Sequence, residues 1–510
     1  MYRCLTLAIH QNTMVFMNDT PNLLLDMLRS GSQSIRETRE ANTLSAGVTR
    51  RGFIVVQKQA REFASSSVGH PAGKVWTAMP GLRGIGKTTI LSQLYHDPAF
   101  NSSLKIYASF DRVKTIGATI QEFIDACEEY MGGSFEKQSQ PVALFLDEVQ
   151  YLNDWAVGLK TIYDRSKKIF IFCTGSSALS LQTDANVARR MDVAKLHPLC
   201  LTEFVMIKQA HDGTPESEIV RPINGLAGSL RNAIFGSRSA SEAYATLERL
   251  KPQVEQYWRQ IPYQNNKLFG EYLAHGTLPF TLDLPNKSAI WERINRILSE
   301  SLDRDVVSYG RFDAATMSAI PQLLFLLASS VETSNTNLSS KLRTDQRTVK
   351  SVLQALEKTE IITAIPPKGA SRGRVGKASK YLFTSPAMRA ALCGFGGVIT
   401  PDNDSSLKGK LFEDIVGLYL KRMFLDAPLT RAIVEYDPSK GGADFIVSPD
   451  GTKSNSIVIE VGVSKSSSKQ VIQTLNEIQG KYGVIVSSGV LEVDEENNVL
   501  RVPIEFFFLV

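Results

Sequence analysis

Two stretches of the sequence carry residue types that suit phosphate chemistry. Residues 81–88 read GLRGIGKT, and residues 142–150 read VALFLDEVQ. In the first stretch, Gly81, Gly84 and Gly86 let backbone N–H groups turn toward phosphate oxygens, because no Cβ stands in the way. The sequence therefore predicts a loop that holds a polyphosphate at the start of a helix.

The residues after the last glycine complete the pattern G-x4-G-K-T. Lys87 is expected to reach the β- and γ-phosphates, and Thr88 to ligate Mg²⁺. Thr89 joins them as a candidate nucleotide contact. The pattern is specific here because it follows a predicted strand, opens a predicted helix and has an acidic strand downstream. ATP and Mg²⁺ are the predicted cofactors.

The second stretch ends a buried strand on two acids. Asp147 is expected to bind the metal and its water shell, and Glu148 to act as the general base that orients the attacking water. The alternative is a solvated acidic pair at a strand end. The segment FCTGSS (172–177) ends the next strand with hydroxyl groups, so that Thr174 or Ser176 could sense the γ-phosphate. The sequence does not choose between them.

These motifs lie in a regular alternation of strands and helices. Alternation of this kind predicts a parallel sheet that is covered on both faces. The expected strands are 74–80, 104–112, 141–150 and 167–177, and the expected helix between them is 118–131.

Length and composition set the class of protein. At roughly 100–200 residues per domain, 510 residues predict three or four domains. Hydrophobic residues make up 43% and charged residues 21%, as in soluble globular proteins. No apolar run reaches the roughly 18 residues that a spanning helix requires, and the start of the chain lacks a secretory pattern. We therefore expect no membrane association and a cytoplasmic location.

Cysteine and histidine spacing argues against three classes of protein. Five cysteines lie far apart without a CxxC pair, so neither a zinc ribbon nor a disulfide framework is expected. Six histidines show no ligand spacing such as HExxH, which argues against a zinc enzyme. The net charge of +5 is only weak evidence for a nucleic-acid partner.

Five ordered motifs carry a family resemblance. The chain resembles AAA-type P-loop ATPases of archaea and bacteria that have a winged helix and a C-terminal PD-(D/E)xK restriction-endonuclease-like domain. The resemblance implies an α/β fold: an AAA-type parallel sheet with a helical lid, then a winged helix and a nuclease-like α/β domain. The motifs are GLRGIGKTTIL (81–91), LFLDEVQYLNDW (144–155), IFCTGSSA (171–178), LHPLCLTEF (196–204) and EYLAHGTLP (271–279).

The resemblance covers most of residues 60–510 and implies a division of the chain. The predicted parts are an N-terminal segment of unassigned role (1–60), the ATPase core (61–210), a helical lid or linker (211–312), a winged helix (313–392) and a nuclease-like domain (405–510).

In the resembling family an arginine stands shortly before the segment PLxxxEF. Here VARRMD offers Arg189 and Arg190. The resemblance implies a γ-phosphate contact, within the subunit or across to a neighbour; the alternative is a solvated surface pair. A ring or a dimer would fit a contact across to a neighbour, and a monomer would fit a contact within the subunit or a solvated surface pair.

Residues 338–362 predict a short helix, a turn and an amphipathic helix, and residues 361–386 predict two strands joined by a basic wing. This arrangement resembles a winged helix. Its cations can contact DNA phosphates without reading sequence. The alternatives are a protein-docking or lid module, or a solvated face. The cations are Arg343, Arg347, Lys350, Arg372, Arg374, Lys377 and Lys380.

The last 105 or so residues predict a helix (408–424), two strands (435–448 and 456–465), a second helix (469–481) and a further strand. This order resembles the core of PD-(D/E)xK nucleases. The resemblance implies catalytic roles for Glu413, Asp444 and Glu460, with Asp444 and Glu460 as metal ligands.

One residue departs from the nuclease pattern. The E-x-K motif requires a lysine two residues after Glu460, and Gly462 stands there. Lys465 or Lys469 could replace it, with Gln470 and Gln473 in support on the second helix. The domain is thus either an active nuclease with a relocated lysine or a degenerate domain kept for binding or assembly.

Two functions follow from these predictions. The first is an ATPase whose nucleotide state positions a winged helix and a nuclease-like domain on double-stranded DNA. The second is a nucleotide-switch scaffold that binds a protein partner and whose C-terminal domain does not cut.

Overall fold

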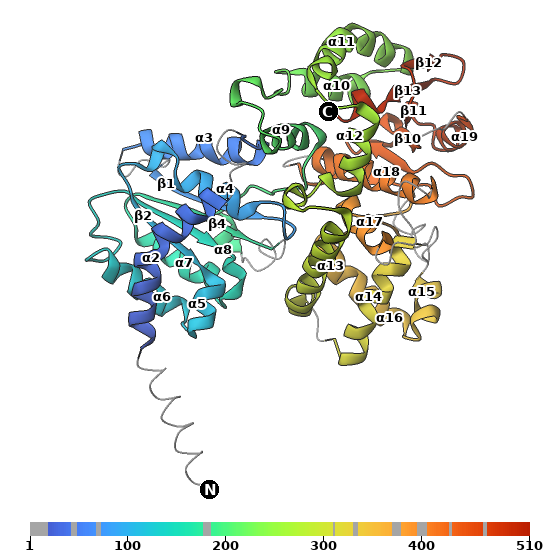
Figure 1. Ribbon diagram of the computed structural model, residues 1–510. Helices are drawn as coiled ribbons and strands as arrows, with labels where there is room; N and C mark the ends of the chain where they lie inside the picture. The colour runs from blue at the N-terminus through green and yellow to red at the C-terminus, as the bar shows by residue number, and fades with distance from the viewer. Residues whose placement is uncertain are drawn as a thin grey trace. The chain divides into compact units, whose positions relative to one another are not determined.

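The computed structural model divides the chain into two compact units, Met1–Leu196 and His197–Val510. Each unit is described by itself (Figure 1). The structure describes residues 19–41, 48–67, 73–176, 185–309, 312–329, 335–369, 379–394, 405–427, 431–462 and 467–510.

The first unit contains a parallel five-stranded sheet with the order β2-β3-β4-β1-β5. The predicted parallel α/β sheet is therefore confirmed. Because all its strands run the same way, β1, β3 and β4 end at the same edge of the sheet, which is where ligands bind in open α/β folds. The strands are β1 (Lys74–Pro80), β2 (Leu104–Ser109), β3 (Val142–Asp147), β4 (Ile169–Gly175) and β5 (Asp192–Val193).

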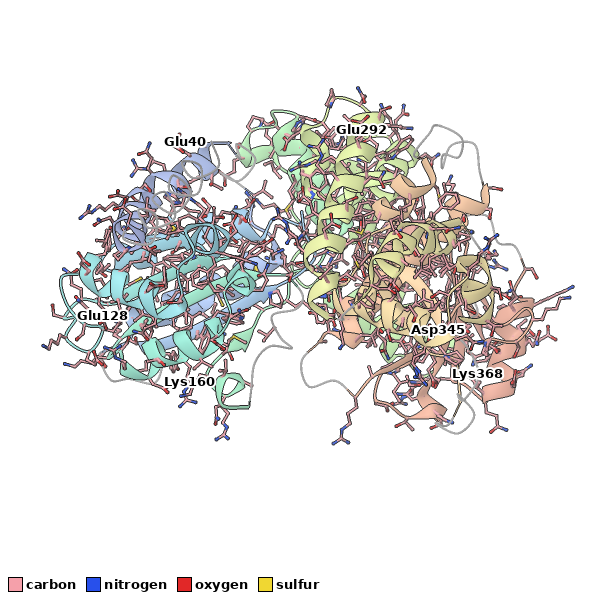
Figure 2. All side chains as sticks on the ribbon, turned by 90° about the horizontal axis from the view of Figure 1, so that it is seen from below. Glu40, Glu128, Lys160, Glu292, Asp345 and Lys368 are labelled. Carbon is pink, nitrogen blue, oxygen red and sulfur yellow. The ribbon has the colours of Figure 1, made fainter. Side chains whose placement is uncertain are left out.

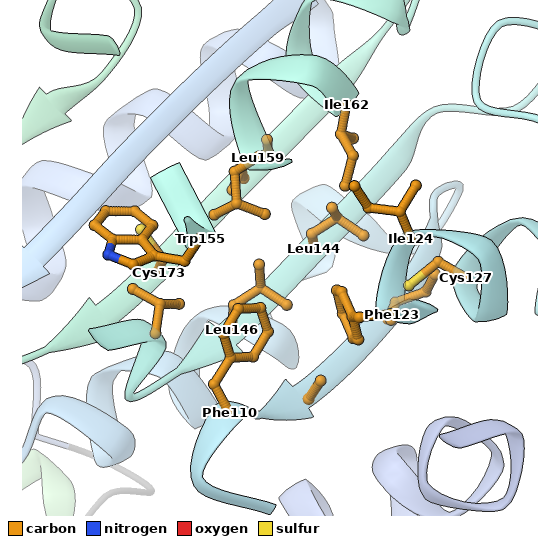
Figure 3. Packing of buried hydrophobic residues seen from close by; sticks show 14 of the residues in the cluster. Phe110, Phe123, Ile124, Cys127, Leu144, Leu146, Trp155, Leu159, Ile162 and Cys173 are labelled. Atoms are coloured by element: carbon orange, nitrogen blue, oxygen red, sulfur yellow. The ribbon is translucent and has the colours of Figure 1, made fainter. Parts of the chain in front are cut away.

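Strand β3 is buried along its whole length because helices cover both faces of the sheet. Successive side chains of a strand point to opposite faces. Leu144 and Leu146 therefore pack into one core with Trp155 and Phe123 (Figure 3), and Phe145 points to the other side. The helices of this unit that follow β1 in the chain are α4 (Lys87–Tyr95), α5 (Phe110–Ile116), α6 (Ile120–Tyr130), α7 (Trp155–Arg165) and α8 (Ala185–Ala188).

The opposite face is filled by aromatic rings. The ring centroids of Phe100 and Phe170 lie 4.7 Å apart, and those of Phe100 and Phe145 lie 5.2 Å apart. Phe63 of α3 (Arg51–Ser65) completes the layer, with its ring centroid 5.5 Å from that of Phe170. Tilted and edge-on aromatic pairs of this kind stabilise a core beyond the area they bury.

The N-terminal segment, for which the sequence indicates no role, contributes two helices to this unit. Helix α2 (Thr20–Ala41) places Leu24, Met27 and Leu28 in the core cluster. Helix α3 (Arg51–Ser65) runs across the predicted boundary at residue 60 and packs against β1 and α4. Residues of the predicted N-terminal segment are therefore part of the unit that carries the sheet.

The second unit begins with helices and then forms a hairpin. Helix α16 follows α15 after a short turn, and the Asp345 side chain (labelled in Figure 2) caps it by accepting from Arg347 N and Thr348 N. This is the predicted order of elements. They are α9 (Leu201–His211), α10 (Leu226–Gly236), α11 (Ala240–Gln260), α12 (Asn265–Glu271), α13 (Lys287–Arg304), α14 (Ala314–Ser329), α15 (Asn335–Leu342), α16 (Gln346–Lys358), β6 (Ile362–Ile365), β7 (Lys380–Phe383) and α17 (Pro386–Gly394).

The chain ends in a mixed six-stranded sheet with the order β12-β13-β11-β10-β9-β8. Strands β10, β11 and β13 are parallel, and β8, β9 and β12 join antiparallel to their neighbours. The elements are α18 (Ser405–Leu420), β8 (Ile433–Glu435), β9 (Phe445–Ser448), β10 (Ile457–Val461), α19 (Lys469–Ile478), β11 (Tyr482–Ser487), β12 (Glu492–Asp494), β13 (Val499–Pro503) and α20 (Ile504–Phe507).

A buried ion pair joins the helical part of this unit to the sheet part. Arg389 of α17 and Asp414 of α18 are both buried, with Nε and Oδ2 at 2.6 Å and a second bond of 2.8 Å. Phe383 N of β7 donates to the same carboxylate at 2.9 Å. Residues predicted to belong to separate parts therefore share one core.

Two smaller expectations can be compared with the structure. Cys127, Cys173, Cys200 and Cys393 are buried, as expected of packing residues, and Cys4 lies outside the described residues. Among the helices of the described residues, none combines the length and the apolar character needed to cross a membrane.

Candidate functional site

The glycine loop lies between the end of β1 and the start of α4. Gly84 and Gly86 have φ angles of 79° and 90°, in the left-handed region that favours glycine. A Cβ on Gly81 would come within 2.5 Å of Leu196 O and 2.6 Å of Ile85 Cδ1. The backbone path of the loop therefore depends on the glycines that the motif supplies.

Lys87 is buried at the first position of α4, so its ammonium group is held over the loop. Lys87 Nζ donates to Gly81 O and to Leu82 O, each at 3.0 Å. These carbonyl oxygens accept from two of the three N–H donors of the Lys87 ammonium group. The remaining donor and the amide groups of the loop form a cationic cradle next to the helix N-terminus, which suits an anionic phosphate.

Two predicted metal ligands are in direct contact beside the loop. Thr88 Oγ1 donates to Asp147 Oδ2 at 2.9 Å. Asp147 also accepts a hydrogen bond from Thr174 Oγ1 on its other oxygen. The contacts exist because β1, β3 and β4 end together, which brings residues 59 and 27 positions away in sequence to Asp147.

The Asp147 carboxylate is buried, and burial raises its pKa to about 6, with a further increase from the charge of Glu148. Hydrogen bonds from Thr174 and Thr88 oppose the increase. A cation beside Asp147 would stabilise its charged form. Within the described residues no group of three His, Cys, Asp or Glu side chains could hold a metal. Mg²⁺ does not require such a group, because it binds through one or two carboxylates, waters and substrate phosphates.

Glu148 follows Asp147 with a φ of 53°, and its backbone N donates to Thr174 Oγ1 at 3.3 Å. Gln150 Nε2 donates to the Glu148 carboxylate. Gln150 therefore orients the predicted base, a role that sequence reasoning missed. Only its position two residues after the base could have indicated it.

The structure distinguishes the two hydroxyl groups at the end of β4. Thr174 Oγ1 is bonded to Asp147, whereas Ser176 Oγ is buried and has no hydrogen-bond partner among the described residues. An orphaned buried hydroxyl at the edge where β1 and β3 also end fits a ligand contact. Thr89, half-buried, follows Thr88 on α4.

Of the two arginines of the predicted γ-phosphate contact, Arg190 lies away from the loop of its own subunit. Arg190 Nε pairs with Asp164 Oδ1 at 2.6 Å, and Lys74, the first residue of β1, donates to Asp164 O at 3.1 Å. Arg190 thus lies near the start of β1. At about 3.3 Å per residue, this strand places it roughly 20 Å from the end of β1 that leads into the glycine loop. Arg189 is exposed. The prediction of a contact within the subunit is therefore wrong for Arg190 in this structure, and a contact across to a neighbour stays a prediction.

A further arginine reaches the loop from the N-terminal segment. The Arg50 guanidinium donates to Ile85 O, inside the glycine loop. Arg83, also in the loop, donates to the Tyr151 hydroxyl at 2.8 Å. The contact of Arg50 joins residues 35 positions apart. No sequence period signals such a contact, so the sequence could not have shown it.

The acids of the predicted nuclease core also come together. Asp444 N donates to Glu460 Oε2 at 3.3 Å, and Lys380 Nζ lies 2.5 Å from Glu413 Oε2 and 2.9 Å from Asp444 Oδ1. Lys380 is therefore paired with carboxylates rather than presented to DNA, which corrects its prediction as a wing cation.

The other residues proposed for this site lie on α19 or outside the described residues. Lys469 and Gln473 are exposed on α19, and Gln470 is half-buried. Lys465 lies outside the described residues, as do the wing cations Arg372, Arg374 and Lys377.

The parallel sheet, the glycine loop and the Thr88–Asp147 contact define the first unit as an AAA-type P-loop ATPase domain. Comparison with protein families supports this, because the AAA domain matches residues 74–205. A domain of unknown function, DUF8612, matches residues 266–398. The chain belongs to the family of the uncharacterized protein MJ1637 of Methanocaldococcus jannaschii: the two are 31% identical over 434 residues, which are 84% of this chain and 83% of the relative.

Two solved structures are distantly similar to the chain. The Holliday junction branch migration motor RuvB of Thermotoga maritima has 12% identity and a TM-score of 0.28, covering 64% of this chain and 94% of its own. AMPPCP-bound DnaA of Aquifex aeolicus has 13% identity and a TM-score of 0.27, covering 62% and 91%.

Proposed function

We propose that the first unit hydrolyses ATP with Mg²⁺ and that its nucleotide state controls a second unit that contacts double-stranded DNA. The observation that carries the ATPase part is the 2.9 Å hydrogen bond between Thr88 and Asp147 beside the glycine loop. A hydroxyl and a carboxylate oxygen at the mouth of an amide cradle are the ligands that Mg²⁺ takes when it bridges to phosphates.

Each residue of the site has a distinct part in this proposal. The loop amides and Lys87 bind the phosphates, and Thr88 and Asp147 hold the metal. Bound Mg²⁺ would supply charge neutralisation on the phosphate oxygens. Glu148, held by Gln150, orients the attacking water and accepts its proton. Ser176 offers its buried hydroxyl to the phosphate end of the ligand.

The DNA-binding part of the proposal rests on α16 and the turn before it. Arg343, Arg347 and Lys350 are exposed there. Three exposed cations on one turn and one helix can neutralise phosphates without reading bases. With the hairpin β6–β7 that follows, this is the arrangement we interpret as a winged helix.

A second candidate function has its own observation. A partly apolar pocket of about 150 Å³ lies between α14 and α16, lined by Ile320, Leu323 and Val352 and also by polar residues that include Asp313 and Arg343. Such a pocket suits a side chain of a protein partner better than a phosphate backbone. The alternative is therefore a nucleotide switch that binds a protein, as the sequence also allowed.

ATP turnover with and without duplex DNA tests the proposal. Wild type is expected to hydrolyse ATP and to turn over faster with DNA. Lys87→Ala should lose turnover, and its matched control Lys160→Ala, which changes a lysine on the surface of α7, should keep it. Normal hydrolysis by Lys87→Ala would overturn the assignment of the loop. Turnover that ignores DNA but responds to a protein would favour the second candidate.

A further inference from the structure

A lysine from the hairpin enters the carboxylate cluster of the C-terminal sheet. Lys380 is the first residue of β7, whereas Glu413 lies on α18 and Asp444 directly precedes β9. The Lys380 ammonium bridges the two carboxylates at 2.5 Å and 2.9 Å. It also lies 5.2 Å from the centre of the Phe445 ring. One cation from a distant part of the sequence thus neutralises two acids.

The bridge is largely shielded from solvent. The side chains of Lys380 and Asp444 are 21% and 16% exposed. Burial opposes the charge on Lys380, but Asp444 and Glu413 outweigh burial and raise the pKa of the lysine. Burial, and then the charge of Asp444, raise the pKa of Glu413. The lysine is therefore a charged partner on which the acids depend.

The same residues do not fit a divalent metal in this arrangement. Asp444 Oδ1 accepts from Lys380, and Asp444 Oδ2 accepts from Val461 N at 3.0 Å. Glu460 Oε2 accepts from Asp444 N. The ammonium group stands where a metal would have to neutralise Glu413 and Asp444.

The hairpin is fastened to the sheet at a second place. Lys368, which follows β6 (labelled in Figure 2), pairs with Asp437 at 2.8 Å and with Glu477 at 2.7 Å. Its backbone N donates to Tyr436 O at 2.8 Å, and Tyr436 N donates to Pro366 O at 3.0 Å. A lysine that follows β6 and the first residue of β7 therefore both pair with carboxylates of the C-terminal α/β part.

We propose that Lys380 supplies the cation of the Glu413–Asp444 cluster in place of a divalent metal, so that the cluster locks the β6–β7 hairpin onto the C-terminal sheet and does not cleave DNA. This proposal stands apart from the ATPase site, because none of its residues lies in the first unit. The lock gives the C-terminal domain an assembly role: it fixes the hairpin that follows the candidate DNA-contacting helix α16.

If Lys380 takes the place of a metal, its removal should change the affinity of the cluster for divalent cations. Replacing Lys380 by the uncharged Met leaves two carboxylates without their cation, at a spacing that one ammonium group spans. Removing a positive charge from such a site should increase its affinity for a divalent cation by about tenfold or more, because the like-charge repulsion is lost. Lys368→Met is the matched control, since it removes the other hairpin lysine and leaves this cluster intact.

The experiment titrates Mn²⁺ into the full chain without nucleotide and follows bound metal by electron paramagnetic resonance. Wild type and Lys368→Met are expected to bind no Mn²⁺ at the Glu413–Asp444 cluster, so that adding Asp444→Asn to either removes no bound metal. Lys380→Met is expected to gain one, and Lys380→Met with Asp444→Asn to lose it again. A wild-type site that Asp444→Asn abolishes would overturn the proposal, as would a Lys380→Met variant that gains none.

A double-mutant cycle in the presence of a chelator tests the lock itself. Lys380→Met and Asp444→Asn should each destabilise the second unit, and the double variant should be less destabilised than the sum, since the two residues share one interaction. Additive effects would overturn the lock. The outcome is independent of the ATPase assignment, because Lys87→Ala should leave both the cycle and the Mn²⁺ result unchanged.

Discussion

At the scale of single residues, the ATPase site uses hydroxyl groups in two different ways. The hydroxyls of Thr88 and Thr174 donate hydrogen bonds to Asp147, which fixes this carboxylate at the end of β3. Ser176 lies on the same edge, and its hydroxyl has no partner among the described residues. Removing a bonded hydroxyl should therefore lower both stability and turnover, whereas removing the orphaned one should lower turnover and leave stability nearly unchanged.

The first prediction concerns Ser176→Ala. Because a buried hydroxyl without a partner stabilises nothing, the free energy of unfolding should change by less than about 1 kcal/mol. ATP turnover should fall, since the hydroxyl is lost to the ligand. Thr174→Val is the matched comparison, and it should lower stability as well, because Asp147 loses a donor. Denaturant unfolding and steady-state turnover separate the cases; a Ser176→Ala variant with unchanged turnover would remove Ser176 from the site.

At the scale of elements, parallel strands and a hairpin bring distant residues together. The sequence was a good guide to β1, β3, β4, α6 and α16, because apolar runs and helical spacing are local signals. It was a good guide to Thr88 and Asp147 as well, because both stand at strand or helix ends in one sheet. The sequence could not indicate the contacts that Lys380, Arg50 and Arg190 make. Those contacts depend on packing between segments that no local pattern relates.

The second prediction concerns the ion pair between α17 and α18. Both Arg389 and Asp414 are buried, and Arg389 also donates to Leu327 O and Ala328 O at the end of α14. Asp414→Asn leaves a buried guanidinium without its charge partner, which should cost about 3–5 kcal/mol of the second unit's stability. Chemical denaturation measures this. A loss no larger than that of an exposed pair, such as Arg259 with Glu255, would contradict it.

The third prediction concerns acid sensitivity at the other hairpin contact. Burial raises the pKa of Asp437, but Lys368, Thr474 and Ser439 outweigh it and lower the pKa to about 2. A carboxyl whose folded pKa lies below its unfolded value, about 3.9, stabilises the fold above that value and loses the effect as pH falls toward the folded pKa.

Asp437→Asn should therefore be less stable than wild type at neutral pH, and the difference should shrink as pH falls from about 4 to about 2. Unfolding midpoints of both proteins across this range provide the measurement. A difference that stays constant with pH would show that Asp437 does not titrate as the ion pair requires.

At the scale of the whole molecule, the proposed function requires the two units to communicate. The four tryptophans are divided between them: Trp76 and Trp155 lie in the first unit, and Trp258 and Trp291 in the second. Replacing one pair by Phe therefore gives a chain whose fluorescence reports on the other unit alone. The ATPase site and the reporter of the second unit then belong to different units of one full-length protein.

The fourth prediction uses this division. A ligand that binds only the folded first unit stabilises it, by about 2.7 kcal/mol at a hundred times its Kd. If nucleotide state controls the second unit, Mg²⁺ and a non-hydrolysable ATP analogue should also shift the unfolding transition reported by Trp258 and Trp291, and Lys87→Ala should abolish both shifts. A shift confined to Trp76 and Trp155 would mean that the units unfold independently of each other's ligand state. The ATPase would then stand, but its control over the hairpin and the C-terminal sheet would not.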